Sequence, residues 1–395
     1  MDLTTNILTL SATGLIAFLV SFILTPVVKK FALRRGWAVP PSPRKIHKVP
    51  MVSIGGLAIF CGFVLAVGGV VLVSWMAGHY WRTIDLVHIG LLLTGCTLIA
   101  VVSLIDDVKD LSPRIRLLFQ FLAALIVIIP QLIMPWHEYW GAIIDSIKLP
   151  GDINLPLLFL SIPFTIFWIM GMTNTVNWMD GLDGLAGGIV FIGAAILFLE
   201  SIFVGRHSND GIPLTSSMLA LALACAILGF LPYNWNPAKI FMGDVGAMFL
   251  GYALAVISII DGAKVAATLL VIGFPVLDVA WVITYRLLHK RSPFKPDRGH
   301  FHHRLLDLGL SQKQIVGIFY AVCGLFGAIG IFVQNTAIKT IGLIVLVMIL
   351  LPLFFYAASR QTRAEIKASK LQQQAVASEM REDEKTQTGA PLRKD

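Results

Sequence analysis

The chain has 395 residues, of which 56% are hydrophobic and only 14% are charged. A soluble domain carries roughly 25% charged residues, and the apolar runs here are continuous rather than the alternating runs of ~10 residues that mark a membrane β-barrel. A single soluble core and a barrel are therefore excluded, and an all-α, polytopic membrane protein is predicted. The net charge of +8 fits basic loops beside a membrane, or an anionic substrate, and no nucleic acid is expected.

Apolar runs long enough to span a bilayer as helices recur along the chain, which predicts about ten or eleven transmembrane helices. The predicted spans are 6–28, 54–76, 86–105, 115–134, 155–175, 185–205, 213–231, 244–260, 264–287, 314–334 and 337–356. The first run lacks the basic start and the small-residue cleavage site of a signal peptide, so it is expected to be retained.

The distribution of Lys and Arg predicts the orientation of these spans. With the N-terminus outside, inside segments hold 26 of the 31 Lys and Arg residues and outside loops hold 5. Because basic residues collect in cytoplasmic loops, we expect the C-terminus in the cytoplasm. Residues 1–356 are then the membrane domain, and 357–395 are a charged cytoplasmic tail, partly disordered. An aromatic belt near the outer ends of spans is expected from Trp75, Trp81, Trp136 and Trp140.

The cysteines indicate neither disulfides nor a zinc site. All lie inside apolar runs without CxxC spacing, so they are expected to be small buried hydrophobes. They are Cys61, Cys96, Cys225 and Cys323.

Two adjacent carboxylates, Asp106 and Asp107, follow the third predicted span directly. They repel each other, and the partial negative charge of a helix C-terminus adds to the repulsion. Such a pair persists where a cation, a shared proton or a basic partner offsets it. The pair therefore acts on a ligand, or it is an interfacial acidic pair neutralised by Arg114 and Arg116.

Further oxygen ligands lie in two other inside loops. Asn177, Asp180 and Asp183 recur every three residues among glycines that permit a broken helix. Asp244 opens the eighth predicted span. Carboxylate and amide oxygens suit magnesium alongside phosphate. The simpler alternatives are an Asn/Asp/Gly turn for the first group and helix capping for Asp244.

A fourth inside loop carries His300, His302, His303 and Arg304. Arginine binds phosphate in a bidentate fork, and histidine donates or accepts protons near neutral pH. The alternatives are a zinc site or a basic patch for anionic lipid. Because four loops on one side offer groups for magnesium or phosphate, an enzyme acting on a phosphorylated donor and a lipid-held acceptor is favoured.

At these four loops the chain resembles the polyprenyl-phosphate N-acetylhexosamine-1-phosphate transferase superfamily, glycosyltransferase family 4. The matching stretches are Asp106-Asp107, Asn177-Trp-Met-Asp-Gly-Leu-Asp-Gly, Ile240-Phe-Met-Gly-Asp-Val-Gly and His300-Phe-His-His-Arg-Leu. Further similar stretches are Arg44-Lys-Ile-His-Lys48 with Gly55-Gly56, and Gly273-Phe-Pro-Val-Leu-Asp278. The histidine loop is similar to that of the bacterial undecaprenyl-phosphate GlcNAc-1-phosphate transferases. Ser53 departs from the pattern, since many relatives have a basic residue there.

This resemblance implies that UDP-GlcNAc and undecaprenyl phosphate give GlcNAc-diphospho-undecaprenol and UMP. The reaction starts a cell-envelope polysaccharide such as O-antigen, common antigen or teichoic acid. It implies the bacterial cytoplasmic membrane, an active site facing the cytoplasm, and Mg²⁺ as cofactor, with Mn²⁺ as a possible substitute. Relatives are often dimeric, so a homodimer is one expected assembly. In phosphoryl transfer, positioning and charge neutralisation dominate catalysis.

The resemblance also implies roles for the residues. Asp244, assisted by Asn177, would hold Mg²⁺. Asp106 or Asp107 would act on the acceptor phosphate, as base or as electrostatic orienter. The implied catalytic residues are Asp106, Asp107, Asp244, His302 and His303. The implied substrate-binding residues are Lys48, Arg116, Asn177, Asp180, Asp183, His300 and Arg304.

Two rival functions and one residue role stay open. The related peptidoglycan branch uses UDP-MurNAc-pentapeptide and typically carries a His-His-His-Phe-Glu loop instead. An ion-coupled transporter would carry acids near the bilayer midplane and inverted-repeat halves. Asp278 lies inside the ninth predicted span, where a charge is expensive. It either pairs with a neighbouring helix or belongs to the site.

Overall fold

The computed structural model describes residues 3–39, 50–78, 81–133, 141–149, 153–207, 213–260, 265–290, 300–332 and 338–349, with Pro352. Within these residues, nine helices are long and apolar enough to cross a membrane, and two shorter apolar helices accompany them. The chain is therefore an all-α, multi-pass membrane protein, as predicted. All the long helices belong to one compact unit, Met1–Leu346.

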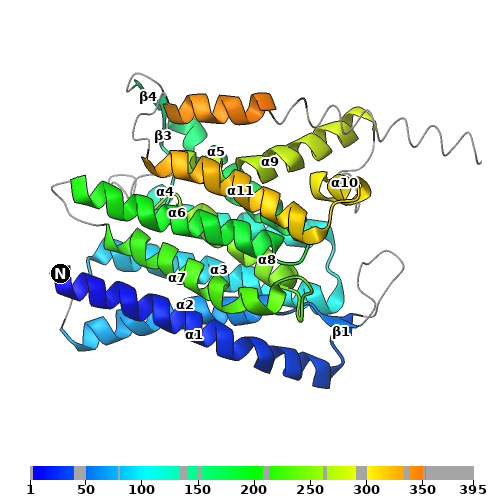
Figure 1. The fold of residues 1–395 in the computed structure, drawn as a ribbon. Helices are drawn as coiled ribbons and strands as arrows, with labels where there is room; N and C mark the ends of the chain where they lie inside the picture. Colours follow the sequence, from blue (N-terminus) through cyan, green and yellow to red (C-terminus); the bar gives the residue numbers. More distant parts are fainter. Residues whose placement is uncertain are drawn as a thin grey trace, which may run out of the picture. The chain divides into compact units, whose positions relative to one another are not determined.

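Figure 1 labels the helices by their order along the chain. The nine long helices are α1 (Leu3–Arg35), α2 (Gly56–Met76), α3 (Thr83–Lys109), α4 (Pro113–Ile133), α5 (Ser161–Met179), α6 (Leu185–His207), α7 (Leu214–Asn234), α9 (Val265–Leu288) and α11 (Gln312–Phe332). The shorter apolar helices are α8 (Gly243–Ile257) and Ile338–Ile349. A short helix, α10 (Phe301–Asp307), precedes α11.

Each predicted span falls on one of these helices, but the start of the fifth was predicted wrongly. The prediction was 155–175, whereas α5 begins at Ser161. The preceding residues form a strand, β4 (Ile153–Pro156), which pairs antiparallel with β3 (Ser146–Leu149). The apolar side chains of β4 continue the hydrophobic run, so composition alone did not separate strand from helix. A second hairpin, β1 (Ala38–Val39) with β2 (Met51–Val52), was also not predicted.

The predicted burial of the cysteines is confirmed for two of the four. All four are free thiols, with Cys96 and Cys323 buried and Cys61 and Cys225 partly buried. The predicted tail, 357–395, lies outside the described residues.

Helix α8 forms the core of the bundle. It packs against α2, α3, α5, α6 and α7, and every residue from Val245 to Ile257 is buried. Its 15 residues give a length of about 22 Å, which is less than the ~30 Å hydrocarbon thickness that a lipid-facing helix must match. Because other helices surround α8, that mismatch is not exposed to lipid.

Paired glycines bring α2 close to the segment that leads into α8. The N–H groups of Gly55 and Gly56 donate to the carbonyl oxygens of Phe241 and Met242, at 2.9 and 2.8 Å. A Cβ on Gly56 would overlap the Cα of Gly246. The Gly55-Gly56 pair is therefore required by contact between two backbones.

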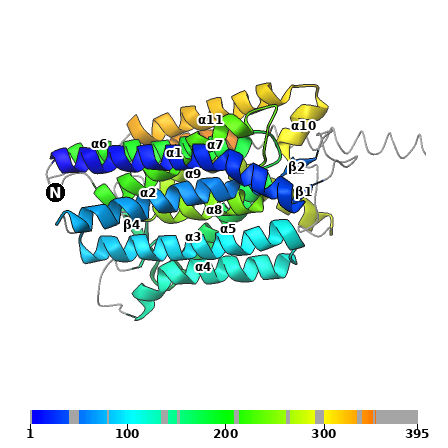
Figure 2. The ribbon, with the colours of Figure 1, turned by 90° about the horizontal axis from the view of Figure 1, so that it is seen from below.

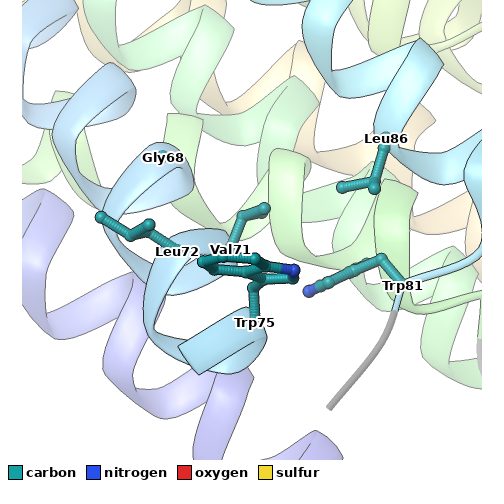
Figure 3. A pocket seen from close by; sticks show the side chains of 6 residues that line it. All are labelled: Gly68, Val71, Leu72, Trp75, Trp81 and Leu86. Carbon is teal, nitrogen blue, oxygen red and sulfur yellow. The ribbon is translucent and has the colours of Figure 1, made fainter. Parts of the chain in front are cut away.

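An apolar pocket of about 370 Å³ lies between the end of α2 and the start of α3. Trp75 and Trp81 point toward one another across it (Figure 3). It is also lined by Gly68, Val71, Leu72 and Leu86. Nearly the whole length of α3 separates this pocket from Asp106. The pocket is therefore remote from the predicted site. Trp136 and Trp140 lie outside the described residues.

We expect Gly56→Ala to lower the thermal midpoint of the detergent-solubilised protein, because backbone atoms of α8 cannot move aside for a methyl group. Overpacking of this kind costs about 1–3 kcal/mol. Gly68→Ala in the same helix is the matched control, since no described atom lies within 4 Å of its added Cβ. Equal midpoints for the two variants, measured on equal amounts of protein, would contradict the close contact between α2 and α8.

Candidate active site

Three helix ends meet at one end of the bundle and bring charged side chains together. Figure 2 shows β1, β2 and α10 at this end, opposite the N-terminus of α1. Asp106 lies in the last turn of α3, which ends where Asp110 takes a left-handed conformation, with φ of 51°. Pro113 then starts α4, and proline suits the first helical position. This tight return places Arg116 opposite Asp106.

Arg116 bridges two carboxylates from distant parts of the chain. Its Nη1 atom lies 3.1 Å from Oδ2 of Asp106 and 3.1 Å from Oδ2 of Asp244. Asp106 also accepts a 2.6 Å hydrogen bond from the N–H of Leu111. Of the predicted acidic pair, Asp106 thus has Arg116 as its basic partner, whereas Asp107 accepts hydrogen bonds from backbone N–H groups. The side chains of Arg116 and Asp244 are 29% and 33% exposed, so a ligand can reach this bridge.

The second carboxylate of the pair, Asp107, caps α8. Its Oδ1 and Oδ2 atoms accept hydrogen bonds from the N–H groups of Asp244 and Val245, both at 3.1 Å. A carboxylate at a helix N-terminus satisfies otherwise unpaired N–H groups and is favoured by the helix dipole. Helix capping was considered for Asp244, and the structure gives that role to Asp107 instead.

The end of α5 adds an amide and a further carboxyl to the cluster. The Nδ2 group of Asn177 donates to Oδ1 of Asp244 at 2.8 Å. Asp180 follows the last residue of α5. Burial, together with the charges of Asp244 and Asp183, raises the pKa of Asp180 to about 7. A bound cation would favour the ionised form of this carboxyl.

Asp183 turns toward the loop before α8 rather than toward the Arg116 bridge. Its buried Oδ2 accepts hydrogen bonds from Nδ2 of Asn236 at 2.8 Å and from the N–H of Ala238 at 3.0 Å. The turn itself is irregular, with Gly184 at φ of +79°, as the glycines predicted. These contacts give Asp183 a structural role, and its contact with a nucleotide stays a prediction.

The histidine loop forms the start of α10. His302 is 2% exposed, and a Cβ on Gly181 would lie 2.5 Å from its Nε2 atom, so the ring rests on the turn after Asp180. Burial and the neighbouring imidazoles of His303 and His300 lower the pKa of His302, which keeps this ring neutral. The loop therefore meets the carboxylate cluster through the Gly181 turn.

Of two other predicted site residues, the structure describes one and not the other. Arg304 is buried on α10, 9% exposed. Lys48 lies outside the described residues.

The amide side chains of Gln120 and Asn174 lie one helical turn further into the bundle than Arg116 and Asn177. This pair was not identified from the sequence. Nδ2 of Asn174 donates to Oε1 of Gln120 at 2.7 Å, which ties α5 to α4 beneath Asn177 and Arg116. Gln120 is 2% exposed. Their spacing in the sequence could have identified them, since Gln120 follows Arg116 by four residues and Asn174 precedes Asn177 by three. Such spacings place two side chains on the same face of a helix.

The donor atoms at Asp244 suit a magnesium ion that is completed by substrate. Magnesium is commonly held by one or two carboxylates plus phosphate oxygens, rather than by an all-protein cage. The described residues contain no group of three or more His, Cys, Asp or Glu side chains arranged for a metal, so substrate oxygens would have to complete the coordination. The amide of Asn177 would have to rotate to present its oxygen, which exchanges two similar groups. A metal on Asp244 would replace its contact with Asn177 or Arg116.

The family model and the named relatives that match this chain indicate the same family. Residues 89–261 match the model of glycosyl transferase family 4. The chain is 33% identical over 345 residues to a Bacillus subtilis protein named a probable undecaprenyl-phosphate N-acetylglucosaminyl 1-phosphate transferase, covering 85% of this chain and 89% of the relative. It is 32% identical to a Mycobacterium tuberculosis decaprenyl-phosphate N-acetylglucosaminephosphotransferase, covering 87% and 89%.

A relative from the peptidoglycan branch matches at a similar level. The Staphylococcus aureus phospho-N-acetylmuramoyl-pentapeptide-transferase is 30% identical over 335 residues, covering 81% of this chain and 98% of the relative. The matches span most of the bundle. The chain therefore belongs to glycosyl transferase family 4, the superfamily of polyprenyl-phosphate N-acetylhexosamine-1-phosphate transferases.

Proposed function

We propose that this protein transfers GlcNAc-1-phosphate from UDP-GlcNAc to undecaprenyl phosphate, giving GlcNAc-diphospho-undecaprenol and UMP. The reaction takes place at the cytoplasmic face of a bacterial cytoplasmic membrane and requires Mg²⁺. It is the first membrane step of a cell-envelope polysaccharide. The relatives named as polyprenyl-phosphate GlcNAc phosphotransferases support this class of reaction.

The Arg116 bridge is the observation that carries the proposal. Asp106 and Asp107 of α3 and Asp244 of α8 bring three carboxylates to one end of the bundle, and Arg116 is the guanidinium that contacts two of them. With all three carboxylates ionised, the four side chains carry a net charge of −2. A divalent cation neutralises that charge and can in turn bind the diphosphate of a nucleotide sugar. The exposed edge of Asp244 is where such a cation would bind.

In the proposed phosphoryl transfer, each of these residues has a separate role. An oxygen of the acceptor phosphate forms a bond to the phosphorus that carries GlcNAc, and the bond from that phosphorus to the bridging oxygen breaks, so that UMP leaves. Asp244 and Asn177 would hold Mg²⁺, which would supply charge neutralisation on the diphosphate. Arg116 binds phosphate oxygens that would otherwise be repelled by the carboxylates.

Of the acidic pair, we assign the action on the acceptor phosphate to Asp106. Within the described residues, the oxygens of Asp107 accept hydrogen bonds only from backbone N–H groups of α8. Asp106 accepts one backbone N–H, from Leu111, but its other oxygen contacts Arg116, a cationic side chain that is partly exposed. Because a lipid phosphate is largely ionised at pH 7, we propose that Asp106 orients the phosphate through Arg116 more than it removes a proton.

The peptidoglycan donor, UDP-MurNAc-pentapeptide, is the second candidate because the Staphylococcus aureus relative matches over 81% of the chain. Against it stands the loop His300-Phe-His-His-Arg, which carries His303-Arg304 where that branch typically has Phe-Glu.

We expect purified protein, given undecaprenyl phosphate and Mg²⁺, to release UMP from UDP-GlcNAc and not from UDP-MurNAc-pentapeptide. A panel of UDP-sugars that includes UDP-GalNAc, assayed by UMP release and by mass spectrometry of the lipid product, tests this. Omission of undecaprenyl phosphate is the control for simple hydrolysis. Release from the pentapeptide donor alone would refute the proposed donor.

We expect Asp244→Asn to lower kcat by roughly 10²-fold or more, because an electrostatic group acting on the transferring phosphoryl group is lost. The variant should also lose the binding of Mn²⁺, followed by electron paramagnetic resonance as a stand-in for Mg²⁺. Asp145→Asn is the control, since Asp145 is exposed beside β3. Near-normal turnover by Asp244→Asn at equal membrane abundance, or unchanged Mn²⁺ binding, would refute the metal assignment.

A further inference from the structure

Asp278 is an acid buried in the middle of an apolar helix. It lies on α9 and is 5% exposed. An ionisable side chain at such a position is costly, and partners usually offset the cost. Asp278 is not among the residues that the proposed reaction uses, so its contacts decide what it does.

Both oxygens of Asp278 bind the start of the histidine loop. Oδ2 lies 3.0 Å from Nδ1 of His300, and Oδ1 accepts a 2.9 Å hydrogen bond from the N–H of Phe301. The His300 ring is itself largely buried, with 13% of its side chain exposed. One carboxylate on α9 therefore holds both the ring of His300 and the first turn of α10.

The contact with Asp278 also determines where His300 carries its hydrogen. An ionised carboxylate only accepts hydrogen bonds, so Nδ1 of His300 must be the donor. In a neutral imidazole the other nitrogen, Nε2, is then left as an acceptor. A partner that holds the second nitrogen of a functional histidine fixes both its tautomer and the orientation of its ring.

From His300 the contacts run on toward the carboxylate cluster. The rings of His300 and His302 are nearly parallel, at 7°, with centroids 5.7 Å apart. His302 rests on Gly181, next to Asp180. The position of His302 against this turn therefore depends on where the start of α10 is held.

We propose that Asp278 is a positioning residue of the active site, which holds His300 with Nδ1 protonated and so places the His300–His302 ring pair against the Gly181 turn. Its effect on turnover rests on the proposed function. Its effect on the tautomer of His300 does not.

The substitution Asp278→Asn separates these roles from simple packing. The amide keeps an oxygen that can accept from Phe301, but it presents N–H groups to His300 and moves the ring hydrogen to Nε2. We expect kcat for UMP release to fall roughly 10- to 100-fold, with the KM for UDP-GlcNAc changing less and the thermal midpoint retained. Glu200→Gln is the matched control, because Glu200 on α6 is 6% exposed and pairs with Lys339 at 3.2 Å. It should leave kcat unchanged.

A double-mutant cycle with His300→Ala tests whether Asp278 acts through His300. If it does, Asp278→Asn should have little further effect on kcat in the His300→Ala background. An unchanged kcat for Asp278→Asn in the native background, or equal losses in both backgrounds, would overturn the proposal.

Nitrogen NMR of histidine-labelled protein in lipid gives a readout that needs no activity. The His300 signal, identified by its loss in His300→Ala, should show protonated Nδ1 in the native protein and protonated Nε2 in Asp278→Asn. Unprotonated Nδ1 in the native protein would overturn the proposal even if Asp278→Asn failed to fold. Failure of the native protein to release UMP from any UDP-sugar would instead refute the proposed function, while this spectrum still decides the role of Asp278.

Discussion

The guanidinium of Arg116 lies between carboxylates from α3 and α8, and the polar end of the bundle depends on that contact. Two like charges ~4 Å apart repel by about 4 kcal/mol at an effective dielectric constant near 20. A guanidinium placed between the two carboxylates offsets that repulsion. The N-terminus of α8 provides a similar offset for Asp107 through two backbone N–H groups. Apolar packing along the helices and charge neutralisation at their ends therefore both stabilise the ends of α3 and α8 side by side.

Helix α8 is where these two kinds of stabilisation meet. Its buried length packs against α2, α3 and α5, and its first turn carries Asp244. The helices that supply Asp106 and Asn177 contact α8 directly, so the distances within the site are set by the same contacts that form the core. A site built from helix ends on a fully packed central helix is more rigid than one carried by loops alone.

The parts of this structure that depend on local composition could be predicted from the sequence. Hydropathy located the spans, and the isolated charges at span ends located Asp106, Asp107 and Asp244. Contacts across large sequence separations could not be predicted in this way. Asp107 and Val245 are 138 residues apart, so the sequence suggested capping by Asp244, which is in the first turn of α8. Asp278 was left between two roles for the same reason, because its partner His300 lies 22 residues further on and beyond the end of α9.

The close approach of Gly56 to Gly246 has a consequence for how such proteins can diverge. A side-chain contact that is lost by mutation can be restored by a change in its partner, whereas contact between two α-carbons offers no partner to change. A Cβ at either position would come too close to the α-carbon of the other, so a larger residue requires the backbone of α2 or α8 to shift. Gly246 stands two residues after Asp244, so a shift of α8 would also displace the carboxylate. A substitution at this helix crossing is therefore expected to affect the position of Asp244 as well as the stability of the fold.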